Sequence, residues 1–112
     1  MALMQGYDAQ AARAFIARAM RKAGIKAAQD ELDAFIARAI DADMQYMQET
    51  GVIDDEGLMG EGEYDDDDAF EALLDMLADG EDDDGEIDRI AQWLDAYMGA
   101  QQDFLEESGL ME

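Results

Sequence analysis

Apolar residues recur at helical spacing in four segments of the chain. The segments run from about Asp8 to Ala23, from about Ala27 to Thr50, from about Asp66 to Asp79 and from about Glu86 to Ser108. Within each segment the apolar residues are three or four positions apart, so they share one face of a helix. Each segment is followed by a residue type that commonly ends a helix, namely Gly24, Gly51, Gly80 and Gly109. The pattern predicts four amphipathic helices.

The composition agrees with an all-α fold. Alanine occurs twenty times, proline never and valine once, at Val52, which favours helix over strand. A chain of 112 residues suits one domain with one core. We therefore expect residues 1–112 to form a single four-helix bundle.

A weak internal repeat relates the two halves of the chain. A shift of 58 residues places Tyr46–Asp54 on Phe104–Glu112 with similar residues at almost every position. The same shift pairs Leu32 with Ile90, Phe35 with Trp93 and Asp43 with Gln101. Two interpretations stay open. In the first, the bundle is a duplicated helical hairpin. In the second, the alignment is one that any two amphipathic helices ending at glycine would give.

The charge divides the chain at the same place. Residues 1–51 hold seven acids and six bases, a net charge of −1, whereas residues 52–112 hold 23 acids and one base, a net charge of −22. The sequence thus predicts a near-neutral hairpin over 1–51 and an acidic hairpin over 52–112. Direct binding to nucleic acid or to an anionic membrane is unfavourable for a chain with a net charge of −23.

Two acidic clusters precede the third and fourth helices. Acids at a helix N-terminus cap free N–H groups and complement the helix dipole. One or two acids meet that need, whereas four in a row repel one another. Capping and solubility therefore explain part of the acidity but not all of it. The candidates for partner binding are therefore the acids of the two clusters: Asp65, Asp66, Asp67, Asp68, Glu81, Asp82, Asp83, Asp84 and Glu86.

The absent residue types exclude much chemistry. The chain has no Cys and no His, so it cannot form a disulfide, a thiolate zinc site or a histidine-based catalytic pair. It also lacks a phosphate-binding loop or another recognisable catalytic motif. We expect a protein that is not an enzyme and that uses no cofactor.

Metal sites are weakly indicated. The segment from Asp82 to Ile87 resembles the centre of an EF-hand loop, but glycine and alanine stand where that loop places its first and last acidic ligands. Weak, unselective divalent-cation binding at residues 65–68 is a further alternative. A carboxylate-bridged dimetal site needs inward-facing acids and His, and Asp43 is the one acid within an apolar stripe. We expect Asp43 and Gln101 to lie near helix ends, hydrogen-bonded or partly wet.

The size, the acidic clusters and the missing catalytic residues together resemble the small acidic inhibitors that imitate DNA, including many anti-CRISPR and anti-restriction proteins. The resemblance concerns charge character and carries over no residue. It implies a basic, nucleic-acid-binding protein as the partner. On the spacing of duplex DNA, about one charge per 1.7 Å, the 22 charges correspond to roughly 37 Å of duplex.

An alternative function uses the apolar side chains. Nine Met and the aromatic residues would then form the surface of a small adaptor or a homodimer, and the acids would serve solubility alone. The more common role of such Met side chains is to fill gaps in a core. No apolar run approaches the length of a membrane span, and the N-terminus lacks a secretory pattern, so we expect a cytoplasmic protein without membrane contact.

Overall fold

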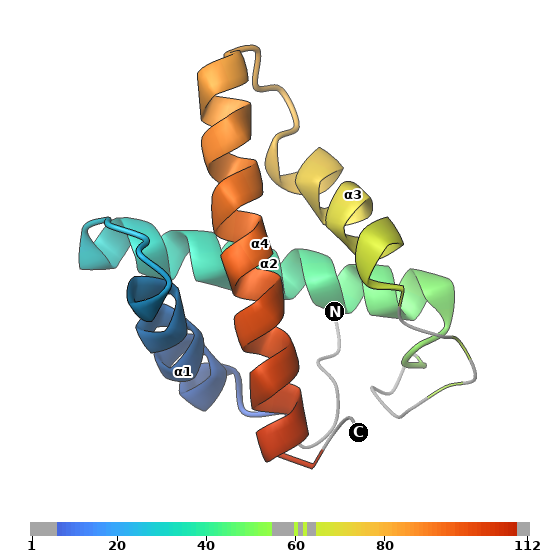
Figure 1. Ribbon diagram of the computed structural model, residues 1–112. Coiled ribbons are helices and arrows are strands. Elements are labelled where there is room, and N and C mark those ends of the chain that lie inside the picture. Colours follow the sequence, from blue (N-terminus) through green and yellow to red (C-terminus); the bar gives the residue numbers. More distant parts are fainter. Residues whose placement is uncertain (1–6, 55–59, 61, 63–64, 110–112) are drawn as a thin grey trace.

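The computed structural model describes residues 7–54, 60, 62 and 65–109, and it contains the four predicted helices (Figure 1). The helices are α1 (Ala9–Lys22), α2 (Gln29–Thr50), α3 (Asp66–Leu77) and α4 (Asp84–Glu107). Each boundary lies within two residues of the prediction. The predicted all-α, four-helix fold is confirmed.

Three of the helices begin at an aspartate that caps free backbone N–H groups. Asp8 accepts hydrogen bonds from the N–H groups of Gln10 and Ala11 at 3.0 and 3.1 Å. Asp65 caps α3 and Asp83 caps α4 in the same way. At the other end of α2, Gly51 adopts a left-handed conformation with φ of 81°, which a glycine reaches at little cost.

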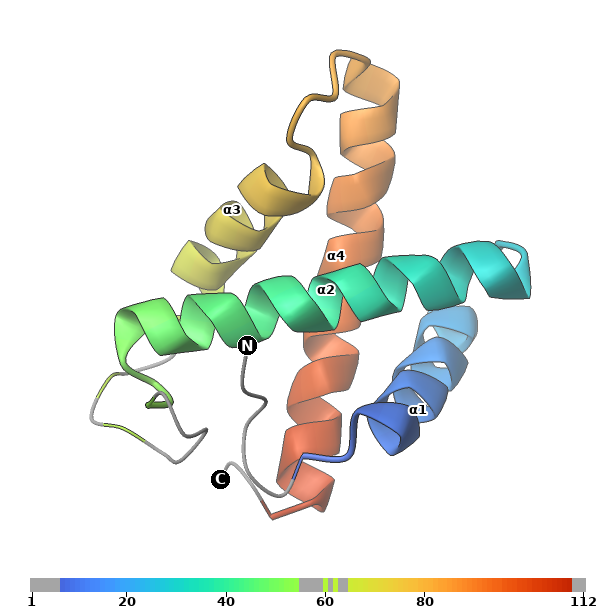
Figure 2. The ribbon, with the colours of Figure 1, turned by 180° about the vertical axis from the view of Figure 1, so that it is seen from behind.

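The two long helices cross, and each short helix fills one of two opposite angles of the cross (Figures 1 and 2). Helix α1 packs against both α2 and α4, and α3 also packs against both. A short hairpin connection joins α1 to α2 and another joins α3 to α4. Each hairpin therefore packs its short helix onto the long helix of the other hairpin.

The predicted apolar stripes face the centre of this arrangement. Leu32, Ile36 and Leu94 are fully buried, and so are the methionines Met20, Met44 and Met47. These Met side chains fill the core, as methionine often does in irregular spaces. The spacing of apolar residues places Trp93 at the edge of the apolar stripe of α4. It is nevertheless only 7% exposed, because its ring packs edge-to-face on Phe35 at a centroid distance of 5.3 Å.

Residues that are 58 positions apart meet where α2 and α4 cross. Phe35 packs on Trp93, Glu31 forms an ion pair with Arg89, and Asp43 shares a hydrogen bond with Gln101. Such pairs are brought together when two similar hairpins pack about an approximate twofold axis. The two hairpins thus contact each other through residues that the repeat pairs.

Within the described part of the chain, no helix combines the length and the apolar character that crossing a membrane requires.

Candidate interaction surface

The predicted partner-binding acids lie at the two ends of α3. Residues 65–68 form the N-cap and first turn of α3, and residues 81–86 form the α3–α4 turn and the first turn of α4. The side chain of Asp66 lies outside the described part of the structure. The other eight acids are exposed or half-buried.

Five of these acids are engaged within the molecule. Asp65 and Asp83 cap helices, and Glu81 accepts a hydrogen bond from the Asp83 N–H at 3.1 Å. Asp68 accepts a hydrogen bond from the Tyr46 hydroxyl at 2.8 Å, and Glu86 pairs with Arg89 at 3.2 Å. These contacts give the five acids a structural role beside any role in binding.

The remaining three acids have no such role. Asp67, Asp82 and Asp84 are exposed, and they make no hydrogen bond or ion pair through their side chains with any described residue. The fold therefore gains nothing from these three carboxylates beyond their general effect on the helix dipoles. They are the predicted acids that remain free to meet a partner.

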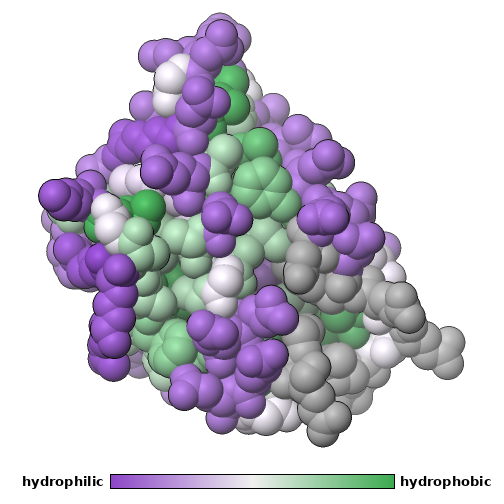
Figure 3. All heavy atoms as spheres, in the orientation of Figure 1, coloured by the Kyte–Doolittle hydropathy of each residue, from purple (hydrophilic) through white to green (hydrophobic). Residues whose placement is uncertain are grey.

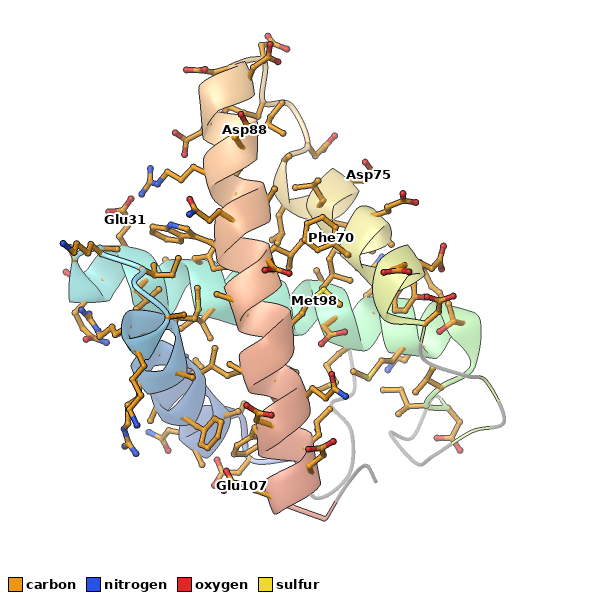
Figure 4. The ribbon with its side chains drawn as sticks, viewed as in Figure 1. Glu31, Phe70, Asp75, Asp88, Met98 and Glu107 are labelled. Atoms are coloured by element: carbon orange, nitrogen blue, oxygen red, sulfur yellow. The ribbon has the colours of Figure 1, made fainter. Side chains whose placement is uncertain are left out.

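The structure adds five acids that the sequence prediction missed. Glu71, Asp75 and Asp79 continue the row that begins at Asp67, and Asp88 and Asp95 lie on the exposed side of α4. Asp75 and Asp88 project from α3 and α4 (Figure 4). The signal was present, because the α3 acids are spaced four residues apart, outside the apolar stripe of that helix. We call the described acids of this region the acidic surface: Asp65, Asp67, Asp68, Glu71, Asp75, Asp79, Glu81, Asp82, Asp83, Asp84, Glu86, Asp88 and Asp95.

Most of the basic side chains lie elsewhere. Arg13, Arg18, Arg21 and Lys22 are exposed on α1, and Lys26 is exposed in the connection that follows. The other two bases are occupied next to the acidic surface. Arg38 donates to the Leu77 carbonyl oxygen at 3.0 Å, and Arg89 pairs with Glu31 and Glu86. Five of the seven bases thus lie on α1 or just after it, apart from the acidic surface, while further acids lie on α2 and near the C-terminal end of α4.

A shallow groove of about 800 Å³ runs between α3 and α4 inside the acidic surface. Phe70 and Met98, both half-buried, form its apolar part and lie between the two helices (Figure 4). Asp67, Glu71 and Asp95 border it. Figure 3 shows the apolar area between the helices with hydrophilic side chains on both sides. We call it the α3–α4 groove.

A second polar cluster lies in the core, around Asp43. The Asp43 carboxylate accepts hydrogen bonds from the Tyr97 hydroxyl at 3.0 Å and from Gln101 Nε2 at 3.4 Å. The Tyr7 hydroxyl donates to Gln101 Oε1 at 2.7 Å, and burial raises the pKa of Tyr7 above its ordinary value. Asp43 and Gln101 are hydrogen-bonded, as expected, and they are 0% and 3% exposed.

The described carboxylates do not converge on a metal position. No group of three or more acidic side chains in the described ranges is arranged to hold a metal ion. The segment that resembles an EF-hand does not form a loop, since α4 begins at Asp84 and Asp83 caps it. The carboxylates of the acidic surface thus lie on the outside of the molecule and are not arranged as a metal-coordination site.

Comparison with known proteins identifies no relative, since the chain matches no family, no curated protein and no solved structure.

Proposed function

We propose that this protein is a non-enzymatic interaction protein, which binds a basic, nucleic-acid-binding protein by imitating the charge of nucleic acid. The observation that carries the proposal is the segregation of charge. Thirteen described carboxylates belong to the acidic surface, while five of the seven bases lie on α1 or just after it. A helical core holds these charges on rigid elements, which favours recognition over solubility alone.

The number of carboxylates on the acidic surface supports imitation of a phosphate backbone. The surface carries thirteen carboxylates on a molecule whose longest dimension is 37 Å. A single strand of B-form DNA carries about one charge per 3.4 Å, and the duplex about one per 1.7 Å. A groove that binds a phosphate backbone would be attracted to this surface, and the long-range field would speed the encounter.

The alternative of a methionine-rich adaptor has less support. Met20, Met44 and Met47 are fully buried, so they offer nothing to a partner. Met76 and Met98 are partly buried and pack against the core. Phe70 and Met98, which are half-buried, reach the surface beside carboxylates in the α3–α4 groove.

The proposal is tested by affinity capture from the native host at low and high salt, with two variants of equal net charge. The first variant neutralises five acids of the acidic surface that cap no helix: Asp67→Asn, Glu71→Gln, Asp75→Asn, Asp82→Asn and Asp84→Asn. The second neutralises five exposed acids elsewhere: Asp30→Asn, Asp41→Asn, Asp103→Asn, Glu106→Gln and Glu107→Gln.

The wild-type protein and the second variant should capture the same nucleic-acid-binding protein at low salt and release it at high salt. The first variant should lose that protein while its helicity stays unchanged. Equal capture by both variants would refute recognition through the acidic surface, because the two differ only in where the charge is removed.

A further inference from the structure

Gly99 is a glycine that the fold does not require. It lies inside α4, which spans Asp84–Glu107, and it is exposed. A Cβ atom added at this position would meet no described atom from outside its own stretch of α4 within 4 Å. Glycine destabilises a helix interior relative to alanine, so the chain gives up stability here with no gain in packing against any described residue.

The position of Gly99 suggests a reason. It lines the α3–α4 groove, next to Met98 in sequence and across the groove from Phe70. The bare backbone of Gly99 opens a place where another chain can come close to α4. Because no residue of the described ranges fills that place, we take an outside chain as its occupant.

The rim of the groove defines the charge of the occupant. Asp67 and Glu71 border the groove from α3 and Asp95 borders it from α4, and all three are exposed. Asp67 and Glu71 are four residues apart, so they lie about 6 Å apart along the axis of α3. Lys or Arg side chains four residues apart on a partner helix have the same axial spacing, which allows two carboxylate pairs at once.

We propose that the α3–α4 groove binds a basic amphipathic helix of the partner protein. An apolar side chain of that helix packs between Phe70 and Met98, its backbone lies against Gly99, and its basic residues meet Asp67, Glu71 and Asp95. This inference rests on the proposed function, and it adds an apolar anchor to a surface otherwise defined by charge. A second copy of the chain fits less well, because each copy carries a net charge of −23.

The test uses two synthetic peptides of 18 residues with the same number of Leu and Lys. One peptide places the Leu residues at helical spacing on one face, and the other has the same residues in scrambled order. Each is titrated into the isotopically labelled full-length protein, with binding followed by backbone amide shifts and by fluorescence anisotropy of the labelled peptide. We expect the amphipathic peptide to bind at least tenfold more tightly and to shift the amides of residues 67–71 and 95–102.

Two variants make the test specific. Gly99→Leu fills the groove and should remove the tenfold preference for the amphipathic peptide, while binding of the scrambled peptide stays unchanged. Ala11→Leu adds the same side chain at an exposed site on α1 and should preserve the preference. Circular dichroism and thermal melting of both variants establish that the fold is intact.

The outcomes separate this inference from the proposed function. If both peptides bind equally and Gly99→Leu changes neither, the groove proposal is wrong while charge-based recognition stands. If neither peptide binds at low salt, the proposed function fails together with the groove. If the groove amides shift with protein concentration in the absence of peptide, the occupant is a second copy and the proposal of a basic partner helix is overturned.

Discussion

Gln101 donates a hydrogen bond to Asp43 across the crossing of α2 and α4, although the two residues are 58 positions apart in the chain. The same carboxylate accepts a hydrogen bond from Tyr97, and Gln101 in turn accepts one from Tyr7. This buried network ties together the N-terminal segment and both long helices. It joins the two hairpins in the core.

Replacement of Asp43 should therefore weaken the whole fold. Asp43→Ala removes the acceptor and leaves the buried Tyr97 hydroxyl and Gln101 amide with fewer partners, which should lower the free energy of unfolding by about 2–4 kcal/mol. Asp41→Ala, an exposed neighbour on α2, should change it by less than about 0.5 kcal/mol. Urea unfolding followed by circular dichroism measures both. Equal effects of the two substitutions would show that the network contributes little.

Tyr46 links α2 to the start of α3. Its hydroxyl donates to Asp68, and removal of this donor in Tyr46→Phe should lower the free energy of unfolding by about 1–2 kcal/mol at neutral pH, because a hydrogen bond to a charged group is lost. The comparison is with Tyr97→Phe, which removes a donor from the buried network instead. A Tyr46→Phe variant as stable as the wild type would contradict the contact.

The stability should also fall at alkaline pH. Burial, with the hydrogen bond to Asp68 and nearby carboxylates, raises the pKa of Tyr46 from 10.0 to about 12. The folded protein thus holds this proton more tightly than the unfolded chain does. The contribution of this bound proton to the free energy of unfolding is fully present below about pH 10 and is lost as the pH rises towards 12. Thermal melting from pH 8 to 12 should show this decline, and Tyr46→Phe should make it shallower, because Tyr7, whose pKa is also raised, still contributes. An unchanged slope in the variant would assign the decline to other groups.

The acids of the acidic surface should divide into two classes. Asp65→Ala and Asp83→Ala remove helix caps and should each lower stability by about 1 kcal/mol. Asp82→Asn, which removes charge from an exposed residue without a described contact, should leave stability unchanged or raise it slightly, because it relieves repulsion. Chemical denaturation of the three variants measures the difference. A loss in Asp82→Asn as large as in the cap variants would show a structural contact for that carboxylate.

Salt should stabilise the fold. The net charge of −23 repels itself in the compact state, and ions screen this repulsion with a Debye length of about 10 Å at 0.1 M. The melting temperature should rise from low to moderate salt, and calcium should act like magnesium at equal concentration because no described group of acids is arranged as a metal site. A much larger effect of micromolar calcium would instead indicate a specific site.

The sequence predicted the helices well, for a physical reason. The apolar stripes, the aspartates before the helices and the glycines after them are local signals, and the four helices begin and end near them. The contact between Phe35 and Trp93 was implicit in the repeat, but only the crossing of α2 and α4 makes the two residues neighbours. Which helices pack together depends on the shapes of whole faces, and spacing along the chain does not encode it.

The surface was predicted only in part. The clusters at both ends of α3 stand out as runs of acids, whereas Glu71 and Asp75 are isolated in the sequence and join the surface through the periodicity of α3. The roles of Asp68 and Gly99 depend on residues from other elements or on open space beside them. Such relations between distant segments appear only once the helices are placed.

A competition experiment with DNA tests whether this protein imitates nucleic acid. The protein captured at low salt is purified, bound to labelled duplex DNA and titrated with the wild-type chain. We expect the chain to displace the DNA completely and excess DNA to displace the chain, because a mimic of nucleic acid occupies the same basic groove as the DNA. A stable complex that contains the partner, the DNA and this chain together would refute imitation.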